Sequence, residues 1–258
     1  MKMSEGTSRI RHDEVIMKKY RERKEINSMS HYAIAVIHRG NQDVDELLEP
    51  YWEGLEVEPY VWKTKDELIK YGREYYSETE TMTDDECFRF MTDAMDKEID
   101  EDGNVYSTYN PDSKWDWYEE GGRFCNMLKL KGGATCDSAR IADLDFSIDE
   151  NLYKESKKWW EDFISPGEKK DEYDGFYNLE YFTDRYKDAE EYATRNSSFT
   201  TYAVLTPDGE WHAPGEIGWF GCSSETSDEM RDWDLNYKKR FIDESDPDWI
   251  MTIVDCHI

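Results

Sequence analysis

The sequence has no long apolar segment and no cysteine pair spaced to bind a metal. None of its apolar runs approaches the roughly 18–20 residues of a membrane span, and its first residues lack the basic, apolar and small-residue order of a secretion signal. Its five cysteines are scattered and form no C-x-x-C pair. We therefore expect no membrane contact, no secretion and no disulfide framework, and a reducing cytoplasm as the compartment.

Basic residues are also scarce. The chain has 32 Lys and Arg against 60 Asp and Glu, a formal net charge of −28. Residues 1–30 hold eight of the basic and five of the acidic residues, which leaves −31 for residues 31–258. Binding to nucleic acid depends on clustered Lys and Arg that release counterions, and no such cluster follows residue 30. We expect no direct contact with nucleic acid, and instead a salt-sensitive attraction to a protein with a basic surface.

Aromatic residues compensate for a modest aliphatic content. Charged residues make up 36% of the chain and apolar residues only 38%, a composition that by itself suggests disorder. Ten Trp, 18 Tyr and 10 Phe nevertheless supply large apolar surfaces. Because a chain of 258 residues can bury a core without disulfides or a structural metal, we predict a folded protein.

The hydrophobic pattern predicts an α+β fold. Strands are expected over 31–38 (HYAIAVIH), 105–109, 198–206, 210–212 and 249–258. Helices are expected over 43–53, 65–76, 83–97, 151–163, 183–195 and 226–241. This order favours a mainly antiparallel sheet with helices on one face. We predict one acidic domain over residues 29–258, preceded by a basic arm or helix over residues 1–28.

Three Thr-x-x-Glu patterns mark helix starts. In a capping box the Thr side chain and the Glu side chain each satisfy a free backbone amide of the first turn. The pattern occurs at Thr64–Glu67, Thr83–Glu86 and Thr226–Glu229.

Several motifs together resemble a family of uncharacterised bacteriophage and prophage proteins. They are Ser30-His31-Tyr32, Asn110-Pro111, Ser113-Lys114-Trp115-Asp116-Trp117-Tyr118, Gly121-Gly122-Arg123, Gly215-Glu216, Gly218-Trp219-Phe220-Gly221 and Asp255-Cys256-His257. The resemblance covers about residue 29 to the end, and residues 1–28 depart from it. It implies a phage or prophage origin and an accessory role in the host cytoplasm, and it carries no assigned activity, fold or catalytic residue.

The first and the last predicted strands contain three candidate catalytic residues. Asp255 and His257 share one face of the last strand because strands have a period of two, and His31 opens the first. If those strands are neighbours, the three groups converge as a general base with its orienting acid, or as metal ligands. The alternative is that Asp255 and His257 end an edge strand in water. His212 either joins the group or lies on a hairpin surface.

The central motif supplies the candidate ligand-binding residues Trp115, Asp116, Trp117, Tyr118, Gly121, Gly122 and Arg123. The Arg123 fork suits a phosphate or carboxylate held beside the indole of Trp115 or Trp117. The alternative is that both indoles pack in the core and that Arg123 pairs with an acid such as Asp116. Trp219, between glycines, either closes over a pocket as a lid or anchors a packed turn.

No catalytic signature accompanies these candidates. The sequence contains no G-x-S-x-G elbow, no Walker A loop and no dinucleotide fingerprint. We therefore predict a phage-encoded acidic accessory protein that acts by binding and inhibits a host defence or nucleic-acid-handling protein. The alternative is a protein or enzyme that sequesters or hydrolyses a nucleotide-like signalling compound. In that case Arg123, Trp115 and Trp117 hold the ligand, and His31, Asp255 and His257 carry out the chemistry.

Overall fold

The computed structural model of the chain describes residues 31–93, 95, 97–167, 179–217 and 223–258. These residues form two compact units. Unit 1 contains residues 31–49 and 114–258, and unit 2 contains residues 50–113. The prediction of a single domain over residues 29–258 did not include the boundaries at Pro50 and Ser113. The predicted arm over residues 1–28 lies outside the described residues.

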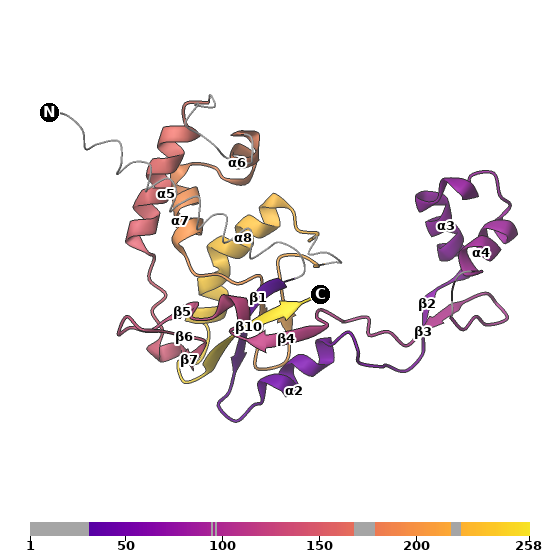
Figure 1. Cartoon of the computed structure of the whole chain (residues 1–258), viewed down its shortest axis with the longest axis horizontal. Coiled ribbons are helices and arrows are strands. Elements are labelled where there is room, and N and C mark those ends of the chain that lie inside the picture. The colour runs from indigo at the N-terminus through magenta and orange to yellow at the C-terminus, as the bar shows by residue number, and fades with distance from the viewer. Residues whose placement is uncertain (1–30, 94, 96, 168–178, 218–222) are drawn as a thin grey trace. The chain divides into compact units, whose positions relative to one another are not determined.

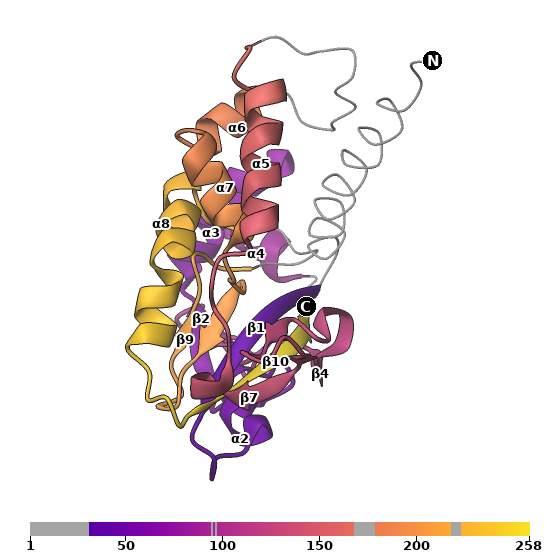
Figure 2. The ribbon, with the colours of Figure 1, turned by 90° about the vertical axis from the view of Figure 1, so that its left-hand side faces the viewer.

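The fold class is α+β with a mainly antiparallel sheet, which confirms the prediction. The main sheet of unit 1 has the strand order β4-β10-β1-β8-β9, and β7 also pairs with β10 (Figures 1 and 2). Its strands are β1 (His31–His38), β4 (Trp117–Glu120), β7 (Ser138–Arg140), β8 (Ala203–Leu205), β9 (Trp211–His212) and β10 (Ile250–His257). Strands β1 and β8 are parallel, and the other pairs are antiparallel.

One face of the sheet packs on helix α8 (Ser227–Lys238), which continues as a π-helical turn over Lys239–Asp243. Because side chains alternate along a strand, one face of β1 carries Ala33, Ala35 and Ile37. These residues share a buried cluster with Trp233 and Tyr237 of α8. Toward one end of the same face the apolar residues of β10 give way to polar ones, and the candidate site lies there.

Three further helices of unit 1 form a second cluster, and they are α5 (Glu150–Phe163), α6 (Leu179–Arg185) and α7 (Ala189–Ser197). Helix α2 (Val44–Leu48) follows β1, and it buries Val44 and Leu48. Helices α5 and α7 lie side by side, and aromatic residues of α5, α6 and α7, including Trp159, Phe182 and Tyr192, pack together (Figures 1 and 2). The single helix predicted over 183–195 is wrong. Asp188 adopts extended backbone and its carboxylate accepts the Glu191 N–H, so a new helix begins there.

Unit 2 is a two-stranded sheet with two helices. Its elements are β2 (Tyr60–Lys63), α3 (Lys65–Tyr75), α4 (Asp84–Thr92) and β3 (Val105–Ser107). Leu68, Cys87, Met91 and Val105 form its buried core. Helix α4 ends at Thr92, five residues before the predicted end at residue 97.

All three predicted capping boxes are present. In α3, α4 and α8 the threonine oxygen accepts the backbone N–H of the glutamate, and the glutamate accepts the threonine N–H. Unit 1 also contains a short hairpin of β5 (Leu128–Lys129) and β6 (Thr135–Cys136). Among the described residues no helix combines the length and the apolar character needed to cross a membrane.

Candidate active site

Three rings lie in a row across strands β4, β10 and β1. The pairing register places Trp117 opposite His257, and His257 opposite His31. Residues directly opposed across strands share a face, so their side chains meet. The Trp117 ring stacks on the His257 ring with centroids 5.4 Å apart, and the His31 ring meets the His257 ring edge-on at 4.8 Å. The His31 ring also meets the Trp117 ring edge-on, at 5.1 Å.

His31 is bound to the buried carboxylate of Asp255. Its Nδ1 lies 2.8 Å from Asp255 Oδ1, and the two side chains are 6% and 1% exposed. The second oxygen, Oδ2, accepts the backbone N–H of Arg123 at 2.9 Å. A carboxylate removed from water needs such donors. With Nδ1–H donating to Asp255, the Nε2 atom of His31 carries the lone pair that is available for proton transfer.

The glycines after β4 allow the chain to approach Asp255. Gly121 and Gly122 have positive φ angles of 68° and 48°, and Gly122 begins a 3₁₀ turn over Gly122–Phe124. A Cβ atom on Gly122 would lie 2.6 Å from Oδ2 of Asp255. A Cβ atom on Gly121 would lie 2.8 Å from the carboxylate of Asp137. The close approach at Gly122 brings the Arg123 N–H within hydrogen-bonding distance of Asp255.

His257 is held by a second carboxylate, that of Asp116. His257 Nδ1 lies 2.7 Å from Asp116 Oδ1, and the Asp116 backbone N–H donates to the His257 carbonyl at 2.9 Å. The same Oδ1 atom accepts the Trp117 N–H at 2.7 Å, which fixes the carboxylate. This pair is more open than the first, because the two side chains are 26% and 35% exposed.

Each imidazole therefore has its own carboxylate at Nδ1. Among the described residues, no hydrogen bond involves Nε2 of His31 or of His257. Two adjacent rings with open Nε2 atoms can act as a general base and a general acid. No three His, Cys, Asp or Glu side chains in the described part of the chain are arranged to hold a metal ion.

The other predicted site residues divide into two groups. Trp115 is buried, and its Nε1 donates to the Leu48 carbonyl at 3.2 Å, so it packs in the core as the alternative proposed. Tyr118 donates its hydroxyl to Asp45 and packs edge-on against Trp115. Partial burial, followed by the bond to Asp45, raises the pKa of Tyr118. Trp117, in contrast, is 43% exposed beside the histidines.

Arg123 contacts the site through its backbone. Its side chain is exposed and makes no ion pair or hydrogen bond with another described residue, so the expected pair with Asp116 is not formed. Sequence reasoning instead missed that Asp116 holds His257. No sequence signal indicated this contact, because it forms only when β4 pairs with β10 and brings the residue before Trp117 close to His257. Trp219 lies outside the described residues.

Two further residues, His212 and Cys256, do not belong to this group. His212 lies on β9, with Nε2 3.7 Å from a Glu210 carboxylate oxygen, and it lines a separate cavity of about 870 Å³ with Trp211 and Phe241. Cys256 is fully buried, and burial followed by the nearby charge of Asp255 raises the pKa of its thiol well above the usual range. A buried neutral thiol is unreactive and acts as a small core residue.

Comparison of the chain with protein-family models, curated proteins and solved structures finds no match. The resemblance to phage accessory proteins therefore stays a prediction. The geometry around His31 and His257 is what bears on function.

Proposed function

We propose that this protein is an acid–base enzyme that cleaves a phosphate ester of a nucleotide-like compound. The observation that carries the proposal is the pair of dyads His31–Asp255 and His257–Asp116, with imidazole centroids 4.8 Å apart. A lone surface histidine needs no carboxylate behind it. Two adjacent histidines that each hydrogen-bond to their own carboxylate have the arrangement that is typical of catalytic histidines.

The pair works when one ring is neutral and the other is protonated. In hydrolysis of a phosphodiester, the neutral ring takes a proton from water as the water oxygen bonds to phosphorus. The bond between phosphorus and the leaving oxygen breaks, and the protonated ring gives its proton to that oxygen. The products are a phosphomonoester and an alcohol, and solvent restores the two protonation states. Asp255 and Asp116 orient the rings and stabilise the imidazolium form.

Two neighbouring residues favour a nucleotide-like substrate. The exposed indole of Trp117 offers a π face on which a base can stack. Arg123 lies in the 3₁₀ turn next to Asp255, and its side chain has no described partner to compete with a phosphate.

The negative charge of the chain opposes an anionic substrate. The formal net charge of −28 repels phosphate at long range, but salt screens charges beyond a Debye length of about 8 Å at physiological ionic strength. Added salt should therefore lower KM for an anionic substrate until it also weakens the contact with Arg123. A neutral substrate would show no such response.

The experiment is an assay of the purified full chain against bis(4-nitrophenyl) phosphate, a cyclic dinucleotide, a cyclic mononucleotide and a dinucleoside monophosphate. The variants are His31→Asn and His257→Asn, because the asparagine amide can replace Nδ1–H as the donor to the carboxylate while Nε2 is lost. His212→Asn is the matched control, since His212 lies outside the site.

We expect each site variant to lose about 10²–10⁴-fold in kcat/KM while the control keeps its activity. Turnover that survives in both site variants, or no turnover of any compound in the panel, would contradict the proposal.

The net charge favours a second candidate function, which is binding to a host protein with a basic surface. That role was predicted from the 60 Asp and Glu residues against 32 Lys and Arg. It is tested by recovering the tagged chain from phage-infected cells at low and at high salt. A specific host protein that is held only at low salt supports it, and recovery of none at low salt contradicts it.

A further inference from the structure

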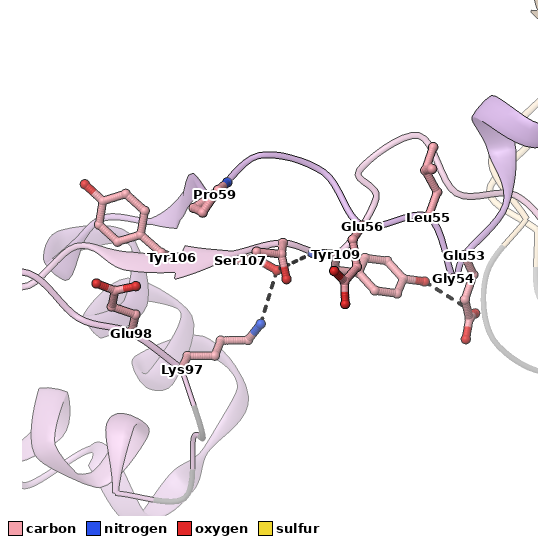
Figure 3. Close-up of a pocket in the computed structure, with 11 residues that line it drawn as sticks. Glu53, Gly54, Leu55, Glu56, Pro59, Lys97, Glu98, Tyr106, Ser107 and Tyr109 are labelled. Carbon is pink, nitrogen blue, oxygen red and sulfur yellow. Dashed lines mark hydrogen bonds between the residues drawn. The ribbon is translucent and has the colours of Figure 1, made fainter.

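Unit 2 contains a cavity of about 420 Å³. Its lining comes from residues 53–56 and 59 and from residues 97, 98 and 106–109 (Figure 3). The two sides are joined where the Val57 N–H donates to the Thr108 carbonyl at 3.1 Å. The cavity therefore belongs to a hydrogen-bonded part of the unit.

The cavity combines aromatic walls with carboxylates. Tyr106 and Tyr109 contribute rings, and in Figure 3 Glu98 lies beside Tyr106 while Glu56 lies beside Tyr109. Glu53 also lines the cavity and accepts the Tyr109 hydroxyl at 3.4 Å. The carboxylates of Glu56 and Glu98 make no ion pair or hydrogen bond with another described residue. Carboxylates beside aromatic faces form the environment that binds ammonium and guanidinium groups.

Lys97 shows how this unit accommodates an ammonium group. Its Nζ donates to Ser107 Oγ at 3.2 Å and lies 5.2 Å from the centre of the Trp62 ring. Lys63 approaches the same ring at 5.0 Å. Lys97 is the one cation in the cavity lining, against three glutamates. Residues 50–113 as a whole carry 18 Asp and Glu against six Lys and Arg.

We infer that this cavity binds an organic cation through an ammonium or guanidinium group. The aromatic rings receive the cation and the free carboxylates of Glu56 and Glu98 neutralise it, which gives the acidic unit 2 a defined binding site. The cation is either a Lys or Arg side chain of a basic segment or a polyamine, since both present the same group. The inference is independent of the phosphate-ester reaction because every lining residue belongs to unit 2.

The test is titration calorimetry of the full chain at low ionic strength with two probes, spermidine and a short Arg- and Lys-containing peptide. The variant is Glu56→Gln, which removes one charge from the cavity lining. Its matched control is Glu58→Gln, two residues away in the same segment, because Glu58 is exposed and does not line the cavity. Both changes are at exposed positions, and circular dichroism checks that the fold is retained.

We expect Glu56→Gln to weaken binding about fivefold and Glu58→Gln to weaken it less than about twofold, since a charge in contact contributes more than one farther away. Binding of the peptide alone would assign the cation to a protein segment, and binding of spermidine alone would assign it to a polyamine. Equal losses in the two variants would show that only the diffuse charge of the unit acts, and would overturn the inference. No binding of either probe at millimolar concentration would also overturn it. Glu56→Gln should leave turnover at the histidine site unchanged, so the two proposals can fail separately.

Discussion

Replacing Gly122 with alanine tests whether the turn after β4 holds Asp255 in place. The φ angle of 48° is left-handed, which costs an L-residue about 1–2 kcal/mol. The new Cβ would also lie 2.6 Å from both Cβ and Oδ2 of Asp255. Asp255 must then move, and its bond to the Arg123 N–H must weaken or break. Loss of a hydrogen bond to a buried charged group costs about 1.5–3 kcal/mol. The expected total loss in the free energy of unfolding is about 2.5–5 kcal/mol.

Gly133→Ala is the matched control. Gly133 also has a positive φ, of 87°, but a Cβ there would meet no atom within 4 Å. It should show only the backbone cost of about 1–2 kcal/mol. Hydrogen exchange of peptides that cover β10 measures the difference within unit 1 alone. If the two variants are equally destabilised, the turn does not clamp Asp255.

The remaining predictions concern pH and thiol reactivity. Hydrogen bonds from Ser147, followed by the contact with Lys129, lower the pKa of Asp145 to about 2. The stability that this carboxylate contributes should be present above about pH 4 and lost as the pH falls toward 2. Asp145→Asn should therefore destabilise the protein at pH 5 and have almost no effect near pH 2. Urea unfolding at the two pH values measures the difference. Native protein treated with a thiol reagent at pH 8 should be labelled at the exposed Cys125 and not at the buried Cys256, whose thiol pKa is raised, as mass spectrometry would show; early labelling of Cys256 would contradict the burial of β10.

Local signals predicted much of the fold. The capping boxes at Thr64, Thr83 and Thr226 were found because the pattern needs only two residues that are three apart in sequence. The strands predicted over 198–206 and 210–212 contain β8 and β9, which pair with each other. The break before α7 was missed, although Asp188 and Glu191 have the same spacing, because aspartate also occurs within helices.

The candidate site was only partly predictable. Strand periodicity placed Asp255 and His257 on one face, and the assumption that β1 and β10 are neighbours brought His31 to them. The pairing of β4 with β10 is not encoded in either strand alone, so the contact of Asp116 with His257 could not be derived. Glycine permits a close backbone approach, but the group that Gly122 approaches, Asp255, emerges only from the three-dimensional fold.

The central position of β1 has a consequence for biosynthesis. Both of its neighbours, β8 and β10, are made after it, and the nearer one begins at Ala203. At roughly 5–20 residues per second, an apolar strand with two open edges waits about 10–30 s on the ribosome for its first partner. Such a strand is a target for chaperones and for aggregation. The yield of folded protein should therefore depend strongly on translation speed and chaperone supply, even if the finished molecule is stable.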